Sequence, residues 1–174
     1  MKLNTSISLR KATVEDSYAI AEILVSAWKA AYSDFMPAEL LANGTDLQSR
    51  SERLRIRWDS SNLHMVTLDE LGAIRGYALE KLPPQIDGVD CEIAALYVHP
   101  QAARIGHGRA LFEHFVSRFT EMGCESMAIH TLVQNQIGRS FYKKMGGEEW
   151  RFDEWNKLPA IWYRWPNIRN ISDT

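Results

Sequence analysis

Cysteines, long runs of one charge and long apolar runs are all scarce in this chain of 174 residues. The two cysteines are Cys91 and Cys124, and neither belongs to a CxxC pair. Their spacing therefore argues against a zinc site or a redox motif, and we interpret them as reduced thiols in a protein that binds no metal. The net charge is −2 and no long basic run occurs, which argues against nonspecific binding of nucleic acid.

The start of the chain, residues 1–7, holds no apolar stretch of signal-peptide length. No segment approaches the roughly 18 apolar residues of a membrane helix, so we expect a cytoplasmic protein that does not bind membranes. The composition, 45% hydrophobic and 24% charged, is typical of a soluble globular protein. We predict a single domain over residues 1–174, with a short flexible tail at 167–174.

The spacing of apolar residues predicts the helices. Thr13 is placed to cap a helix, and apolar residues recur at helical spacing from Ile20 to Ala31. A second short helix is expected to end at Asn43-Gly44. Predicted helices cover residues 14–32, 37–41, 46–59, a segment from Gly106 to Gly123, and 136–145.

Strand-like runs occupy most of the remaining chain. They are predicted at residues 7–11, 64–68, 74–82, 91–98 and 127–132, with two aromatic-rich strands at 150–155 and 161–165. Strands and helices alternate in the middle of the chain, which indicates a partly parallel sheet, while the outer hairpins indicate antiparallel edges. The order predicts a mixed α/β (α+β) fold.

The strongest local motif is a strand end followed by two glycines at the start of a helix. The sequence reads Leu96-Tyr97-Val98-His99-Pro100 and then Gly106-His107-Gly108-Arg109-Ala110-Leu111. Such a turn points backbone N–H groups outward at the positive end of a helix dipole, which suits a pyrophosphate. A dinucleotide fingerprint is excluded, because Leu111 stands where it requires a small residue. Taken alone, the motif fits a helix start without a ligand equally well.

A second motif follows the next strand: Asn135, and then Phe141-Tyr142-Lys143-Lys144-Met145-Gly146. A tyrosine on an amphipathic helix more often packs than reacts. Phe141 and Met145 already supply the apolar stripe, four residues apart, so Tyr142 points at a different angle.

Together, these motifs resemble the core of the GNAT-type N-acetyltransferase family, densest from 92 to 147. The family pattern is an apolar strand ending in V-x-P, a loop of form Q/R-x-x-G-x-G/A, a helix and a strand, and then an Asn and F-Y-x-K-x-G. The opening, with Leu9-Arg10-Lys11-Ala12-Thr13 and a helix carrying Trp28 and Tyr32, is also similar. Three positions depart from the pattern. Ala103 stands at the Q/R position with Arg104 one residue later, Gly147 replaces a usual Phe, and Gly138 replaces a common Ala.

The resemblance implies a central mixed, mostly antiparallel sheet with a splayed parallel strand pair and helices on both faces. It implies acetyl-CoA as co-substrate, bound by a core region at 90–147. The residues implied in binding it are Leu96, Tyr97, Val98, Arg104, Ile105, Gly106, His107, Gly108, Arg109, Ala110, Asn135 and Tyr142. Backbone N–H groups do most of this work, so we expect binding to survive the loss of a side chain at Ala103.

The resemblance also implies that an amine attacks the thioester carbonyl directly, through a tetrahedral intermediate. Tyr142 is then the acid that protonates the leaving thiolate, and a backbone N–H of Leu96–Val98 stabilises the oxyanion. Glu92 is the candidate base, acting directly or through water, or else a solvated carboxylate at a strand start. Of the histidines, we interpret His130 as a satisfied core residue, His107 as an incidental exposed residue and His99 as a turn residue.

The acceptor is the least determined part. Trp28 and Tyr32 share one helix face and are candidate substrate contacts, although core packing is favoured for Trp28. The closing Trp162-Tyr163-Arg164-Trp165 either lines the site or seals an edge. A small-molecule amine is expected, with a peptide or protein amine, or a non-catalytic acyl-CoA-binding module, as alternatives. The aromatic-rich edge makes a homodimer plausible.

Overall fold

The structure is a computed structural model that describes residues 7–171. The described residues group into two compact units, and the predicted single domain stays a prediction. Unit 1 contains the chain up to Leu79 together with Leu96–Phe112. Unit 2 contains Glu80–Ala95 together with the chain from Glu113 onward.

The predicted elements are nearly all present. The helices are α1 (Ser17–Tyr32), α2 (Ala38–Thr45), α3 (Leu47–Ile56), α4 (His107–Glu121) and α5 (Gln136–Lys144), with short 3-10 turns at Val14–Asp16, Pro100–Ala102 and Ile168–Ile171. The strands are β1 (Ser8–Lys11), β2 (His64–Leu68), β3 (Ile74–Lys81), β4 (Cys91–Val98), β5 (Met127–Leu132), β6 (Glu148–Trp155) and β7 (Leu158–Trp165). Within residues 7–171, no helix is both long and apolar enough to cross a membrane.

The strand order is β1-β2-β3-β4-β5-β7-β6. β4 and β5 run parallel, whereas β1–β2, β2–β3, β5–β7 and β6–β7 are antiparallel. Over the part of the chain that the structure describes, the sheet is thus mixed and mostly antiparallel, which confirms the predicted fold class.

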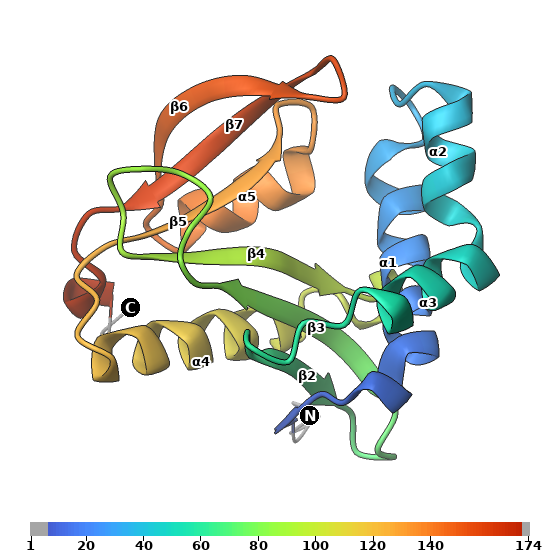
Figure 1. Ribbon diagram of the computed structural model, residues 1–174, viewed down its shortest axis with the longest axis horizontal. Helices are drawn as coiled ribbons and strands as arrows, with labels where there is room; N and C mark the ends of the chain where they lie inside the picture. The colour runs from blue at the N-terminus through green and yellow to red at the C-terminus, as the bar shows by residue number, and fades with distance from the viewer. Residues whose placement is uncertain (1–6, 172–174) are drawn as a thin grey trace, which may run out of the picture. The chain divides into compact units, whose positions relative to one another are not determined.

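In unit 1, helices α1, α2 and α3 lie side by side and contact one another (Figure 1). α1 buries the apolar face that its sequence predicts, including Ile20 and Leu24. The predicted end of the second helix at Asn43-Gly44 is wrong, because α2 continues to Thr45. Gly44 stays in the helix and is buried against the ring of Trp28. A side chain at this position would overlap that ring, so the glycine allows the close contact between α2 and α1.

The start of α4 packs against strands β2 and β3 of unit 1. Thr67 of β2 pairs with Gly76 of β3. A Cβ on Gly76 would lie 2.5 Å from the Thr67 hydroxyl and 3.0 Å from Leu111 in the first turns of α4. The glycine therefore permits the start of α4 to lie close against β2 and β3.

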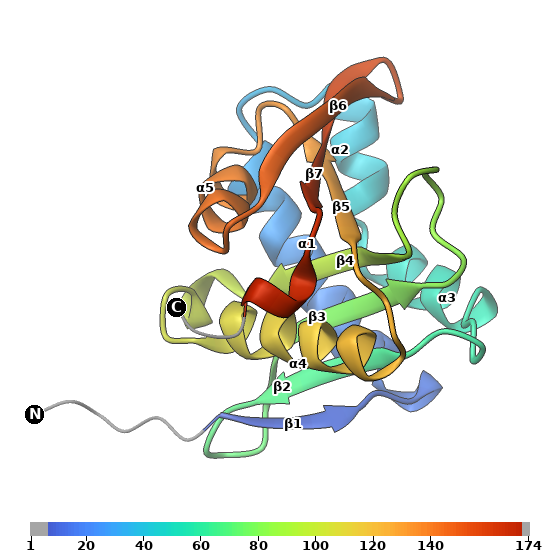
Figure 2. The same cartoon turned by 90° about the vertical axis from the view of Figure 1, so that its left-hand side faces the viewer.

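In unit 2, β5, β7 and β6 run next to one another, with α5 against them (Figure 2). Part of the predicted flexible tail is ordered: Ile168–Ile171 form a 3-10 helix, Ile168 is fully buried, and its N–H donates to the Glu125 carbonyl at 2.9 Å. The tail prediction is therefore wrong for 168–171, because Ile168 adds apolar surface to the core. Residues 172–174 lie outside the described part of the chain.

The interpretation of the cysteines as free thiols is also wrong. Cys91 and Cys124 are joined by a disulfide, 33 residues apart in the sequence. A carboxylate brings the two segments together, because Asp90 accepts hydrogen bonds from the backbone N–H groups of Glu125 and Ser126, both at 2.9 Å. No CxxC spacing marked this pair, since the contact is tertiary.

Candidate functional site

The glycine-rich loop of unit 1 begins with a fixed turn. His99 caps the 3-10 turn that follows β4: its Nδ1 accepts the N–H of Gln101 at 3.3 Å, and its carbonyl accepts the N–H of Ala102 at 2.8 Å. This confirms the turn role predicted for His99. The chain then passes through two left-handed residues, Arg104 at φ 65° and Gly106 at φ 114°. A φ of 114° is a conformation that glycine adopts without strain.

The loop presents the start of α4 as a set of hydrogen-bond donors. The first helical bond runs from the N–H of Ala110 to the carbonyl of Gly106, at 2.9 Å. The N–H groups of His107, Gly108 and Arg109 precede it, in the first turn where a helix provides no backbone acceptor for its donors. Arg104 and Arg109 are exposed beside them. Donors at a positive helix end, with cationic side chains nearby, form an arrangement that binds a phosphate or pyrophosphate.

His107 is not the incidental exposed residue that the sequence suggested. Its side chain is 1% exposed, and no residue of the described chain makes a hydrogen bond with either ring nitrogen. Burial lowers the pKa of His107 below 6.5, and of the charged neighbours Asp69 raises it and Arg75 lowers it. The prediction failed because the positive φ of Gly106 starts the helix at His107 and turns the imidazole inward while its N–H stays in the first turn.

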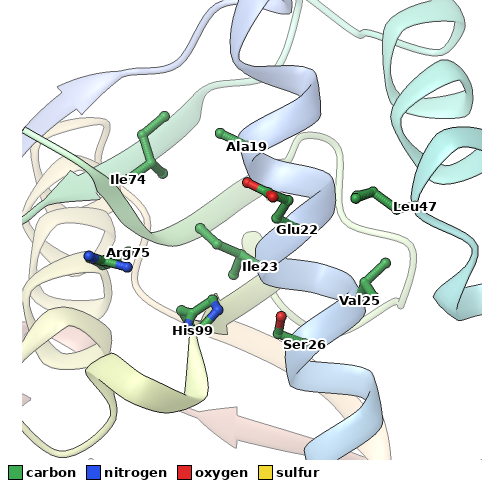
Figure 3. Close-up of a pocket in the computed structure, with 9 residues that line it drawn as sticks. All are labelled: Ala19, Glu22, Ile23, Val25, Ser26, Leu47, Ile74, Arg75 and His99. Atoms are coloured by element: carbon green, nitrogen blue, oxygen red, sulfur yellow. The ribbon is translucent and has the colours of Figure 1, made fainter.

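A separate half-open pocket of ≈ 330 Å³ lies in unit 1 (Figure 3). Its polar groups come from Glu22 and Ser26 of α1, Arg75 of β3 and His99. Arg75 is already bound to Asp69, with Nε 2.7 Å from the carboxylate. The lining residues are Ala19, Glu22, Ile23, Val25, Ser26, Leu47, Ile74, Arg75 and His99, and none was predicted to bind the cofactor or the amine.

Trp28 and Tyr32, the predicted substrate contacts, are both buried in unit 1. Their rings meet edge to face with centroids 5.3 Å apart, and the guanidinium of Arg50 lies 4.3 Å from the Trp28 ring centroid. These contacts tie α1 to α3, and they agree with core packing for Trp28. A role in substrate binding stays a prediction for both residues.

Asn135, predicted to hold the pantetheine arm or a water, caps α5 in unit 2. Its Oδ1 accepts the N–H of Gly138 at 3.0 Å, and its Nδ2 donates to the Thr131 hydroxyl at 2.9 Å. This contact also explains Gly138, because a Cβ there would lie 2.6 Å from the Asn135 amide nitrogen. Asn135 thus fixes where α5 begins relative to β5.

Tyr142, the predicted acid, lies in the second half of α5 and is buried. Its ring lies 5.6 Å from that of Tyr163 and 6.4 Å from that of Trp165, both on β7. Trp165 also explains why Gly147 replaces the family Phe, since a Cβ at 147 would lie 2.6 Å from the indole ring. The indole occupies the space beside Tyr142 that a larger residue at 147 would need.

A group of charges holds α5 against the hairpin. Lys143 and Arg139 of α5 both lie 2.7 Å from the Glu149 carboxylate of β6. Arg139 also donates to the Tyr163 hydroxyl at 3.1 Å. The hydrogen bond from Lys143, followed by that from Arg139, lowers the pKa of Glu149 to about 2. The helix that carries Tyr142 is therefore tied to β6 and β7 at two side chains.

Glu92, the predicted base, is 2% exposed at the start of β4. Its carboxylate accepts the backbone N–H of Gln85 at 2.6 Å and the Gln85 side-chain amide at 3.2 Å. Burial raises the pKa of Glu92. The carboxylate thus anchors the loop between β3 and β4, and its base role stays a prediction.

One group of side chains escaped the sequence interpretation. His130 of β5 is satisfied, as expected, but its side chain is 24% exposed and not in the core. Its Nε2 lies 2.7 Å from Asp153 Oδ1 of β6, and its ring stacks on Trp162 of β7 at 4.4 Å. Strand alternation in the closing hairpin could have indicated that Asp153 and Trp162 share a face, but the pairing of β7 with β5 is tertiary.

No group of three or more His, Cys, Asp or Glu side chains suited to a metal ion occurs among residues 7–171. The donors present are backbone N–H groups at a helix start, a buried phenol and a histidine–carboxylate pair. These groups suit the binding of an anionic ligand and proton transfer.

Comparison with known proteins agrees with this chemistry. A sequence model of the acetyltransferase (GNAT) family matches residues 19–147, which is most of the chain. The chain therefore belongs to the GNAT acetyltransferase family, and this membership supports an acyltransferase.

The relatives extend along nearly the whole chain. It is 26% identical over 169 residues to a Bacillus subtilis (strain 168) protein described as the uncharacterized N-acetyltransferase YuaI, covering 93% of this chain and 94% of the relative. The PaiA N-acetyltransferase of Thermoplasma acidophilum, solved in complex with coenzyme A, has a TM-score of 0.73 and 21% identity, covering 92% of this chain and 99% of that one. The ribosomal-protein-S18-alanine N-acetyltransferase of Escherichia coli has a TM-score of 0.67 and 15% identity, covering 93% and 94%. These structural likenesses show a shared fold.

Proposed function

We propose that this protein moves an acetyl group from acetyl-CoA to the primary amine of a small molecule. The observation that carries the proposal is the start of α4, where Gly106 at φ 114° leaves the first-turn N–H groups facing away from the helix. The loop would bind the pyrophosphate through these backbone donors, as the family motif implies. The coenzyme A bound to the PaiA structure supports the choice of cofactor.

The remaining roles are assigned to side chains of unit 2 and to the backbone of β4. Tyr142 protonates the leaving thiolate, and Asn135, besides capping α5, orders the pantetheine arm. A backbone N–H of Leu96–Val98 stabilises the oxyanion. Glu92 is a candidate to take the proton of the ammonium, but its burial and its bonds to Gln85 weigh against direct contact with an amine.

A small, positively charged amine is proposed because of the charge on the closing hairpin of unit 2. Carboxylates dominate the exposed hairpin strand β6, where Glu148, Glu149, Asp153 and Glu154 outnumber Arg151. A cationic acceptor is attracted to such a surface.

The test is release of free thiol from acetyl-CoA in the presence of single amines. The panel contains spermidine, tyramine, glucosamine, lysine and a short peptide with a free N-terminus. Turnover with one of the first four supports the proposal, and turnover with the peptide alone replaces it by peptide acetylation. Calorimetric binding of coenzyme A without turnover of any amine would show a non-catalytic acyl-CoA-binding protein.

A further inference from the structure

His130 is held in one orientation by a carboxylate and an indole. Asp153 Oδ1 lies 2.7 Å from the His130 Nε2, while Asp153 Oδ2 accepts the Trp162 indole N–H at 2.9 Å. The Trp162 ring stacks on the imidazole with an interplanar angle of 19°. Nε2–H donates to the Asp153 carboxylate, so the neutral ring keeps its lone pair on Nδ1. Three strands, β5, β6 and β7, thus fix a single nitrogen as proton acceptor.

The position of His130 follows from the register of the parallel pair. The pairing of β4 with β5 runs from Cys91↔Met127 to Ile93↔Ile129, and His130 is the next residue of β5. Paired neighbours point to the same face of a sheet, so His130 shares a face with Ala128, with Glu92 and with Ala94 two residues further along β4. Ala94 is exposed although it lies in the middle of its strand. This face is therefore open to solvent where the two strands cease to pair.

Tyr142 lies on the other face. Its ring contacts Tyr163, which pairs with Ile129, the residue whose side chain points opposite to that of His130. A base on one face and an acid on the other suit a reaction in which the amine approaches a carbonyl from one side and the thiolate leaves on the other.

We propose that His130 is the catalytic base of the acetyl transfer and that Asp153 is its positioning residue. The inference rests on the proposed function, and it gives the base role to a partly exposed group in place of the buried Glu92. By strand register, the charged groups on this face are Glu92 of β4, Glu148, Arg151 and Asp153 of β6 and Arg164 of β7. Both arginines lie over the ring of Trp150, at 4.0 and 5.0 Å.

The proton and electron balance is complete with these groups. The ammonium gives a proton to His130 Nδ1, and the freed amine forms a C–N bond to the acetyl carbon while the carbonyl electron pair moves to oxygen. As the carbonyl re-forms, the C–S bond breaks and its pair goes to sulfur. Tyr142 protonates the thiolate, the nitrogen gives its second proton to water, and the tyrosinate takes a proton back from water. His130, being partly exposed, also returns its proton to water, so that one net proton is released for each amide formed.

The experiment compares His130→Asn and His130→Ala with the wild type, using the panel amine that the wild type acetylates fastest. The matched control is His114→Asn on α4, a half-buried histidine outside the site. Each variant is first checked for coenzyme A affinity by calorimetry and for thermal unfolding, so that a folding defect is recognised. Loss of the base lowers kcat by about 100-fold or more, since general-base catalysis typically contributes that factor. The expected control activity is that of the wild type.

A second readout separates catalysis from structure. Free imidazole added to His130→Ala restores turnover in proportion to its concentration, which a structural role would not produce. Asp153→Asn lowers kcat by a smaller factor and leaves KM for the amine unchanged, because the amide no longer fixes the orientation and tautomer of the imidazole. Its control is Glu125→Gln, an exposed carboxylate in the segment before β5 with the same change in net charge.

The outcomes are distinguishable. If the wild type turns over and His130→Asn is fully active, the base assignment is overturned and the proposed function stands. The same holds if Glu92→Gln is inactive while the His130 variants are not. A folded His130→Ala variant that is inactive and that imidazole does not restore also overturns it. Absence of turnover in the wild type overturns the proposed function and this inference with it.

Discussion

The loop of unit 1 and the α5–hairpin region of unit 2 contribute to the proposed chemistry by different means. At the loop, the useful atoms are backbone N–H groups, while the nearest side chains either face solvent, as Arg104 does, or turn inward, as His107 does. In unit 2 the useful atoms belong to side chains, Tyr142 and His130, each held by several neighbours. The loop therefore depends on local conformation, and the other region depends on tertiary contacts.

This difference predicts opposite responses to mutation. Substitutions of Tyr142 and His130 in unit 2 should lower turnover and spare cofactor affinity. Substitutions in the loop should lower affinity only where they disturb the backbone. Measuring kcat and the Kd for acetyl-CoA in variants of each region therefore distinguishes the two.

Tyr142→Phe tests the side-chain region. We expect kcat to fall by about 100-fold, because the thiolate then leaves without its acid, while the Kd for acetyl-CoA changes little. The phenyl ring keeps the contacts with Tyr163 and Trp165, so the fold is retained. Steady-state thiol release and calorimetry measure the two quantities. Unchanged turnover would remove Tyr142 from the acid role.

Gly106→Ala tests the backbone region. At φ 114° an alanine is strained by about 1–2 kcal/mol, so the loop shifts and the Kd for acetyl-CoA rises roughly tenfold. The kcat at saturating acetyl-CoA stays near the wild-type value. The matched control is Gly123→Ala after α4, which also has a positive φ but lies outside the loop, and which should lower stability without changing Kd. Equal effects on Kd for both variants would contradict a specific role for the loop.

The two regions also differ in how far the sequence predicts them. The order of strands and helices and the mixed sheet followed from periodicity and from the family motif, because both are local in the chain. His107 was misjudged, since its burial depends on one φ angle at Gly106. The His130–Asp153 pair and the Cys91–Cys124 bridge were missed because each joins segments at least 23 residues apart. No spacing rule reports such contacts.

Arg104→Gly sharpens the comparison further, because it removes the side chain and keeps the left-handed backbone at φ 65°. If backbone donors provide most of the binding, Kd for acetyl-CoA rises by no more than about fivefold, the cost of one exposed charge. The salt dependence of Kd should weaken at the same time. Ala103→Gln, which restores the family residue, is the companion variant and should leave affinity equal or higher. A loss of affinity well beyond fivefold in Arg104→Gly would show that this side chain is a principal ligand.

The smallest expected effect concerns stability at the base of the loop. Burial keeps His107 neutral in the folded chain, with its pKa below 6.5, whereas the unfolded chain takes up the proton at the ordinary value. Stability is therefore complete above pH 6.5 and falls as the pH drops from there toward the lowered pKa. His107→Leu removes this loss, reducing the slope by up to about 1.4 kcal/mol per pH unit. Part of the slope remains, because burial also lowers the pKa of His114.

At neutral pH the His107→Leu variant is as stable as the wild type or more stable by about 1 kcal/mol, since two buried nitrogens without partners are removed. Urea unfolding at several pH values measures both quantities. An unchanged slope would mean that His107 is protonated in the folded chain, and the inner side of the loop would then carry a positive charge.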